Sequence, residues 1–188
     1  MVLFVDACAR EKSRTRKIAE ALLHGLQEAE IETVDLYSED LKPLIGEQIL
    51  FRDRALQEGD FSDEYFDLAK QFANADLIIM AAPYWDMSFP AILKLYVERI
   101  SVNGITFRYR EDGTPEGLCR GKKLFYVTTS GGEIGKYNFG YDYIKALTMA
   151  LFGIDDATCV RVVGLDMEGT DVAEVLANAE NGIKELLK

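Results

Sequence analysis

Apolar residues follow two different periods along this chain, which predicts strands and helices in alternation. Short apolar runs predict buried strands at residues 2–6, 31–36, 76–82, 122–130 and 157–164. Apolar residues that recur every three or four positions predict amphipathic helices at residues 13–29, 62–74, 89–100, 141–152 and 171–187. Five strands alternating with helices predict an α/β fold with a doubly wound parallel sheet and helices on both faces.

The apolar content of individual strands indicates their places in the sheet. Residues 76–82 (DLIIMAA) are almost continuously apolar, as expected of a central strand that is covered on both faces. Residues 31–36 (IETVDL) carry polar residues between apolar ones, which is typical of an edge strand. Ser62 is expected to cap the helix at 62–74, and Pro90 suits the first turn of the next helix.

Two segments fall outside the alternation. Residues 37–60 combine a proline and two glycines with a short helical pattern at 47–58, which indicates a surface excursion. Residues 104–121 alternate apolar and polar positions before the turn dipeptide Asp112-Gly113, which predicts a hairpin outside the main sheet. The sequence shows no linker, internal repeat or low-complexity stretch, so residues 1–188 are expected to form one domain.

Composition and charge narrow the choice of partners. The 188 residues are 48% hydrophobic and carry a formal net charge of −11. This acidity argues against nucleic acid and against an anionic membrane as partners. No stretch approaches the roughly 18 apolar residues of a membrane span. Because Cys8, Cys119 and Cys159 show no CxxC spacing, we expect no disulfide framework, no zinc site and a reducing, cytoplasmic location.

The loop after the first strand has the chemistry of a phosphate site. It leads into a helix N-terminus, where unpaired N–H groups and the positive end of the dipole attract anions. Because GxxxxGK[ST] and GxGxxG are both absent, a single terminal phosphate fits better than a nucleotide-hydrolase or dinucleotide site. The alternative is an ordinary N-cap with a solvated basic first turn. The hydroxyl and basic side chains of this loop are Arg10, Lys12, Ser13, Arg14, Thr15 and Arg16.

The loop at residues 83–90, after the third strand, combines aromatic and polar residues. Ligands of open α/β sheets bind where the carboxyl ends of strands open into loops. Tyr84 and Trp85 could flank a flat ring, and backbone N–H groups near Asp86 and Met87 could reach its polar edge. The alternative is that Tyr84 and Trp85 are core aromatics at a strand end.

A third loop, Ser130-Gly131-Gly132, follows the fourth strand. Glycine permits a close backbone approach that a side chain would block. Three suitable loops at successive strand ends are therefore expected to bind one ligand together.

Other candidates for chemistry are poor. His24 is the only histidine and lies off the apolar stripe of its helix, so we expect an ordinary surface residue. Without a second histidine, a Ser-His-Asp or Cys-His arrangement or a histidine metal site is hard to build. Cys8 could be activated by the helix N-terminus, or could be a small buried thiol. The scattered carboxylates show no metal-loop spacing, so no metal site is expected.

Three stretches together resemble one known family. They are APYWDMSFPAILKLYVERI, then GITFRY, then TTSGGEIGKYNFGYDYIKALTMALFGI. They resemble the flavodoxin-like NAD(P)H dehydrogenase (quinone) family, which includes FMN-dependent azoreductases. The resemblance implies a flavodoxin-like five-stranded sheet of order 2-1-3-4-5, a homodimer, and a flavin site that the partner subunit completes.

The resemblance also implies a cofactor and a reaction. FMN is expected rather than FAD, because the chain is too short for the C-terminal extension of the FAD enzymes. NAD(P)H would be the electron donor, and a quinone or an azo or nitro compound the acceptor, in a ping-pong reaction through the flavin. The alternatives are a flavodoxin-type electron carrier without NAD(P)H turnover, or a phosphorylated metabolite in the basic loop. The residues implied to bind the cofactor are Arg10, Ser13, Arg14, Thr15, Pro83, Tyr84, Trp85, Asp86, Met87, Ser130, Gly131 and Gly132.

Some residues depart from the family pattern. The set from Tyr84 to Met87 is not the usual one of either the azoreductases or the mammalian-type quinone reductases, which leaves the acceptor open. Ser130 abuts Gly131, where azoreductases often carry an intervening arginine. Tyr137 occupies a place where quinone reductases have a tyrosine near the ring, so it is the one candidate for a catalytic side chain. The preference between NADH and NADPH also stays open.

Overall fold

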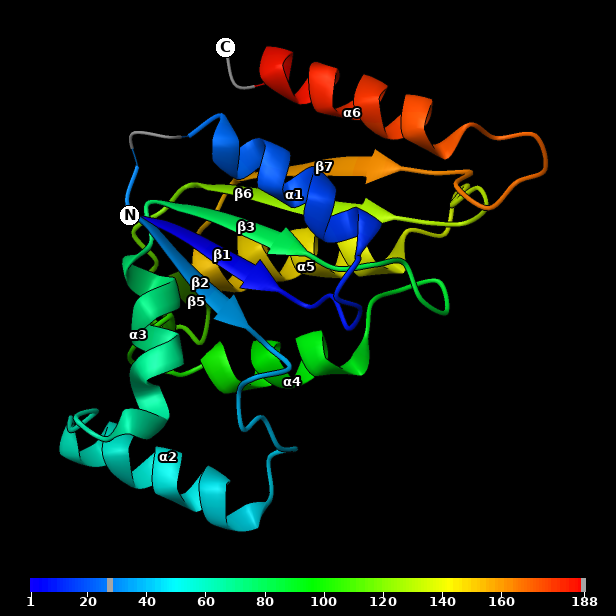
Figure 1. Cartoon of the computed structure of the whole chain (residues 1–188). Coiled ribbons are helices and arrows are strands. Elements are labelled where there is room, and N and C mark those ends of the chain that lie inside the picture. Colours follow the sequence, from blue (N-terminus) through cyan, green and yellow to red (C-terminus); the bar gives the residue numbers. More distant parts are fainter. Residues whose placement is uncertain (27–28, 187–188) are drawn as a thin grey trace.

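The strands form the parallel sheet that the sequence predicts. The computed structural model describes residues 1–26 and 29–186, and in this part of the chain the main sheet has five strands in the order β2-β1-β3-β6-β7 (Figure 1). Counted along the chain among these parallel strands, the order is 2-1-3-4-5, which confirms the flavodoxin-like prediction. Its strands are β1 (Val2–Asp6), β2 (Ile31–Asp35), β3 (Leu77–Ala81), β6 (Lys123–Thr129) and β7 (Asp156–Val162).

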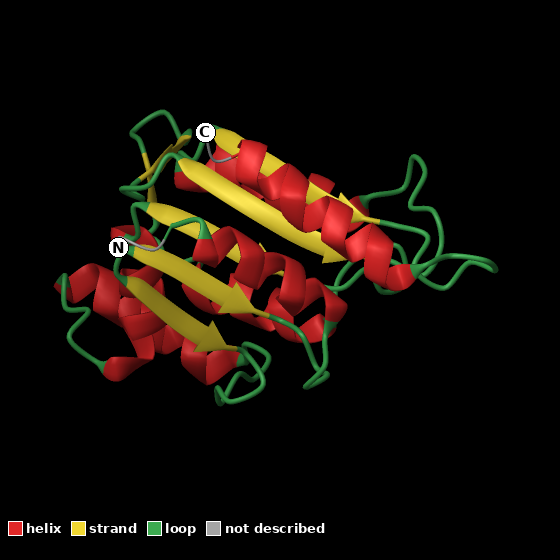
Figure 2. Ribbon diagram, turned by 45° about the horizontal axis from the view of Figure 1, so that its top comes forward, coloured by secondary structure: helices red, strands yellow, loops and turns green. Residues whose placement is uncertain are grey.

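Helices cover both faces of the sheet, as Figures 1 and 2 show. One face packs against α1 (Arg14–His24) and α6 (Val172–Leu186). The other face packs against α3 (Asp67–Asn74), α4 (Ala91–Ile100) and α5 (Phe139–Leu147). Successive residues of a strand point to opposite faces, so β3 contributes to both cores. The central position predicted for β3 is thereby confirmed, and β2 lies at the predicted edge.

The first helix is shorter than its apolar pattern predicts. Helix α1 ends at His24, and the N–H of Gly25 donates to the carbonyls of Ala21 and Leu22. The predicted end at residue 29 is therefore wrong, although residues 27–28 lie outside the described residues. Leu26 and Ala29 still pack against the same hydrophobic core, which explains why the pattern continues beyond the helix. The last predicted position of α6, residue 187, also lies outside the described residues.

The start of α3 also differs from the prediction. Ser62 is not its cap, because a 3-10 turn, Glu64–Phe66, precedes the helix. The carboxylate of Asp63 caps this turn by accepting the N–H of Tyr65 at 2.8 Å. Ser62 instead donates its N–H to the Asp60 side chain at 2.9 Å. Two short-range carboxylate contacts thus take the place of the predicted serine cap.

The two segments outside the alternation are ordered elements of their own. Residues 37–60 contain α2 (Gly46–Glu58), in which Ala55 is buried while most other side chains are at least partly exposed. The predicted hairpin is confirmed as β4 (Phe107–Tyr109) and β5 (Pro115–Gly117), an antiparallel pair separate from the main sheet. Within residues 1–26 and 29–186, no helix combines the length and apolarity needed to cross a membrane.

Candidate functional site

The loops that follow four strands meet at the carboxyl edge of the sheet and line one cavity. Its volume is about 240 Å³. The lining includes nine of the residues predicted from the sequence: Arg10, Ser13, Arg14, Thr15, Pro83, Tyr84, Trp85, Ser130 and Gly131. Asp86, Met87, Gly132 and Tyr137 do not line it. Lys12, which the sequence placed among the basic side chains of the phosphate loop, lines the cavity as well. Four further lining residues were not predicted: Ala9, Thr129, Leu165 and Asp166.

Arg16 holds the loop between β1 and α1 in place through contacts with its backbone. Its guanidinium forms an ion pair with the buried carboxylate of Asp6. It also donates to the carbonyl oxygens of Cys8 and Arg10 at 2.8 Å and of Glu11 at 2.9 Å. Arg16 is therefore a scaffold residue of the loop and not part of the cavity lining.

Exposed cations and the start of α1 form one wall of the cavity. Arg10 and Lys12 are exposed and line the cavity. Ser13 caps α1, since its hydroxyl accepts the N–H of Arg16 at 3.3 Å. Thr15 is buried, and its hydroxyl contacts that of Thr129 at 2.7 Å, which joins this loop to the end of β6. Ser13 is thus the N-cap of α1, and phosphate binding by this loop stays a prediction.

The loop after β3 closes on itself in a tight turn. Trp85 and Ser88 exchange backbone hydrogen bonds of 3.1 and 2.8 Å. Between them Asp86 and Met87 have φ values of 50° and 67°. Positive φ at both central residues is the pattern of a type I′ turn, which normally selects glycine or asparagine. Trp85 is 41% exposed, so its interpretation as a core aromatic is wrong.

Replacing Met87 by glycine is expected to stabilise the protein by about 0.5 kcal/mol, because it removes the cost of a left-handed backbone at a residue with a side chain. Urea unfolding followed by circular dichroism measures this change. Met167 is a matched control, since it is another exposed loop methionine but has no positive φ. Met167→Gly should be neutral or destabilising, and the same gain at both positions would contradict the interpretation.

Tyr137 is attached to the site through its backbone. The Tyr84 hydroxyl donates to the Tyr137 carbonyl at 2.7 Å, and the N–H of Phe139 donates to the carbonyl of Met87 at 3.2 Å. These bonds tie the loop before α5 to the loop after β3. The Tyr137 side chain is largely exposed and lies outside the cavity lining.

The loop between β7 and α6 is a part of the site that was not predicted from the sequence. The N–H groups of Leu165 and Asp166 donate to the carbonyls of Ser130 and Gly131 at 3.2 and 2.9 Å. The Arg14 guanidinium donates to the Leu165 carbonyl at 3.2 Å and to Asp166 Oδ1 at 2.8 Å. A sequence signal did exist, because these residues follow the fifth predicted strand and the carboxyl ends of parallel strands share one edge.

Cys8 is a buried thiol rather than an activated nucleophile. Its Sγ contacts the Ala81 carbonyl at 3.7 Å, and burial raises its pKa to about 12. Burial likewise raises the pKa of Cys119 to about 12. A thiol with so high a pKa is almost entirely protonated at neutral pH and is a poor nucleophile.

These raised pKa values predict a loss of stability in alkali. The ordinary value is 9.0, so the stabilisation from keeping both thiols neutral is complete below about pH 9. It decreases as the pH rises from 9 towards 12, because the unfolded chain then releases protons that the folded chain retains. Urea unfolding at pH 7.5 and pH 10.5 should show the decrease. A Cys8→Ala/Cys119→Ala variant should show less of it, and an equal decrease in this variant would contradict the assignment.

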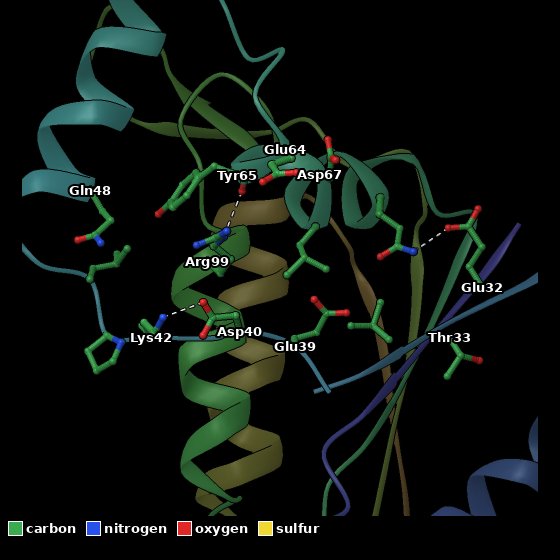
Figure 3. Close-up of a pocket in the computed structure, with 15 residues that line it drawn as sticks. Glu32, Thr33, Glu39, Asp40, Lys42, Gln48, Glu64, Tyr65, Asp67 and Arg99 are labelled. Atoms are coloured by element: carbon green, nitrogen blue, oxygen red, sulfur yellow. Dashed lines mark hydrogen bonds and ion pairs between the residues drawn. The ribbon is translucent and has the colours of Figure 1, made fainter. Parts of the chain in front are cut away.

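A larger cavity lies at the β2 edge of the sheet, near α2, α3 and α4 (Figure 3). Its volume is about 710 Å³. Arg99 lies over the ring of Tyr65, with its guanidinium carbon 3.6 Å from the ring centre, and donates to the Tyr65 carbonyl. Lys42 pairs with Asp40 at 2.7 Å. The lining is too acidic for a phosphate, since it contains the carboxylates of Glu32, Glu39, Asp40, Glu64 and Asp67.

Comparisons with known proteins place the chain in a family. The model of a family described as having a flavodoxin-like fold matches residues 1–187. The FMN-dependent NADH:quinone oxidoreductase 2 of Clostridium acetobutylicum is 37% identical, over 100% of this chain and 98% of that protein. An FMN-dependent NADH:quinone oxidoreductase of Coprothermobacter proteolyticus is 33% identical, with the same coverage.

A solved structure agrees with these relatives. The azoreductase of Bacillus anthracis superimposes with a TM-score of 0.81 and 25% identity, over 99% of this chain and 97% of that one. Full-length matches of this kind also agree with the resemblance carried by the sequence motifs. The chain therefore belongs to the flavodoxin-like NAD(P)H dehydrogenase (quinone) and azoreductase family.

Proposed function

We propose that this protein is an FMN-dependent NAD(P)H:acceptor oxidoreductase that reduces quinones or azo or nitro compounds in a ping-pong reaction. One observation carries the proposal: a single cavity joins a basic helix N-terminus to an aromatic loop and a glycine loop. The names of the relatives, FMN-dependent NADH:quinone oxidoreductases, support the choice of cofactor and donor. They also support FMN over FAD.

The residues at one end of the cavity fit a phosphate. Arg10 and Lys12 supply positive charge, and the first turn of α1 supplies backbone N–H groups and the positive end of a helix dipole. Ser13 keeps the helix start in place through its cap. We assign these residues to the terminal phosphate of FMN, together with Arg14 and Thr15 at the cavity wall.

The residues at the other end fit the flavin ring. Pro83, Tyr84 and Trp85 provide apolar and aromatic surface. The Ser130 and Gly131 carbonyls are used by the β7–α6 loop, whereas the structure of residues 1–26 and 29–186 shows no hydrogen bond from the N–H groups of Gly131 and Gly132. These N–H groups would stabilise negative charge that develops on the ring. Backbone N–H groups at Asp86 and Met87 would reach the polar edge of the ring.

The cofactor would supply the redox chemistry. Held by these residues, FMN would supply the hydride chemistry that links a nicotinamide donor to a second substrate. The chain binds and orients the cofactor and leaves one side of the site open. The exposed Trp85 and Tyr137 are available to contact the acceptor there.

The purified protein should bind FMN, turn yellow and bleach when NADH or NADPH is added without oxygen. Steady-state rates with a panel of quinones and azo compounds, measured with both nicotinamides, would then identify the preferred substrates. A protein that binds FMN but is not reduced by either nicotinamide would instead be a flavodoxin-type electron carrier. A protein that takes up no FMN would contradict both interpretations.

We also propose a cytoplasmic homodimer. Large apolar side chains are exposed on α2 (Ile49 and Leu50) and on α5 (Phe139 and Tyr143). Tyr109 of the hairpin is exposed as well. A second copy would remove such surfaces from water. Light scattering should give twice the mass of the 21.1 kDa chain, and a monomer at micromolar concentration would contradict the dimer.

A further inference from the structure

Asp166 makes contacts to two of the loops that line the cavity. Its Oδ1 accepts a hydrogen bond from the Arg14 guanidinium at 2.8 Å. Its backbone N–H donates to the Gly131 carbonyl at 2.9 Å. Its Oδ2 lies directly over Gly131, only 2.4 Å from where a β carbon on that glycine would be. The carboxylate therefore occupies the space that the missing side chain leaves free.

The contacts around Asp166 fix the orientation of the glycine loop. Gly164, Leu165 and Asp166 donate their N–H groups to the carbonyls of residues 132, 130 and 131 in turn, at 3.3, 3.2 and 2.9 Å. These carbonyls are thereby committed to the β7–α6 loop. The N–H groups of Gly131 and Gly132 stay available for a ligand.

Stability alone does not account for the Arg14–Asp166 ion pair. The two side chains are 38% and 65% exposed, and an ion pair at such a site contributes only about 0–1 kcal/mol. Its location is more informative, since both side chains line the cavity. A carboxylate here sets the local electrostatic potential, and Arg14 partly offsets it.

We propose that Asp166 is a cofactor-positioning residue that holds Arg14 and the Gly131 backbone in place and sets the reduction potential of the bound FMN. The inference rests on the proposed function, because it presumes that FMN binds in this cavity. Reduction adds negative charge to the ring, and a nearby carboxylate opposes that charge. Removing the carboxylate charge should therefore favour the reduced cofactor.

Two variants separate the positioning effect from the charge effect. Asp166→Asn keeps an oxygen that can accept from Arg14 but loses the charge. Its dissociation constant for oxidised FMN should stay within threefold of that of the unmodified protein. The reduced cofactor should bind about fivefold more tightly relative to the oxidised one, which corresponds to a rise of about 20 mV for a two-electron couple. Asp166→Ala also loses the acceptor, and its dissociation constant for oxidised FMN should rise about tenfold.

Glu168→Gln is the matched control. It removes the same charge from the same loop, but Glu168 is exposed and does not line the cavity. Its FMN affinity and reduction potential should equal those of the unmodified protein. The measurements are fluorescence titration with FMN and anaerobic potentiometric titration, with thermal unfolding to verify that each variant is folded.

The outcomes distinguish the two proposals. If the unmodified protein does not bind FMN, the proposed function fails. If the unmodified protein binds FMN but Asp166→Asn leaves the reduction potential of the bound FMN unchanged, or Glu168→Gln shifts that potential equally, only the proposed role of Asp166 is refuted. If Asp166→Ala does not fold, the reduction potential of FMN bound to Asp166→Asn still tests the proposed role of Asp166.

Discussion

Replacing Arg16 by methionine is expected to destabilise the protein by about 3 kcal/mol and to weaken FMN binding severely. Asp6 is 4% exposed, and removing Arg16 leaves a buried carboxylate without its ionic partner, held only by the Cys8 N–H at 2.9 Å. The same substitution releases the carbonyls of Cys8, Arg10 and Glu11, which now all accept from one guanidinium. Urea unfolding followed by circular dichroism gives the loss of stability, and fluorescence titration gives the loss of affinity.

Arg14→Met is the matched control for stability. The Arg14 ion pair is exposed, so its loss should cost no more than about 1 kcal/mol. In a second test, Asp6→Asn in the Arg16→Met background should recover part of the stability, because the buried charge is then gone. Equal losses of stability in Arg14→Met and Arg16→Met would show that the burial of Asp6 does not raise the cost of removing its ion-pair partner.

Reversing the charge of the two exposed cations at the cavity is expected to have the largest effect on FMN affinity. Arg10→Glu and Lys12→Glu should each raise the dissociation constant about tenfold, and the double variant about a hundredfold if the effects add. Both side chains line the cavity and are exposed, so the fold should tolerate the changes. Titration at low and high salt should show the smaller salt dependence that follows from losing cationic contacts.

Arg54→Glu provides the control for net charge. Arg54 is exposed on α2, and it does not line this cavity. Its reversal should leave the FMN dissociation constant within twofold. If all three single reversals had the same effect, the phosphate would not lie at the N-terminus of α1. A glutamate at Thr15 would be a poorer test, since Thr15 is buried against Thr129.

The sheet was predictable because its signals are local and strong. An unbroken apolar run identified β3 as a central strand, and polar residues within β2 identified an edge. The exact ends of helices were less predictable. Leu26 and Ala29 continue the apolar pattern after α1 has ended, since a capping loop can pack on the same core as the helix before it.

The site was predictable in part, for a related reason. Three of its loops carry residue types that indicate phosphate or ring binding. The fourth loop does not, because Leu165 and Asp166 gain their place only through contacts with residues far away in the sequence. Arg14 and Asp166 are 152 positions apart. Local patterns also do not reveal whether a cation such as Arg16 lines the cavity or donates to the backbone carbonyls of its own loop.

The position of β1 inside the sheet, between β2 and β3, affects how the chain can fold during synthesis. Val2 pairs with Leu77, so β1 lacks one of its two neighbours until 75 more residues have been added. At typical rates of elongation this takes about 4–15 s. The face shared by α1 and α6 is completed last, because Leu176 and Ile183 belong to the final helix. Nascent chains therefore expose part of this sheet face, covered only by α1, until translation is nearly finished, and we expect chaperones to bind it at that stage.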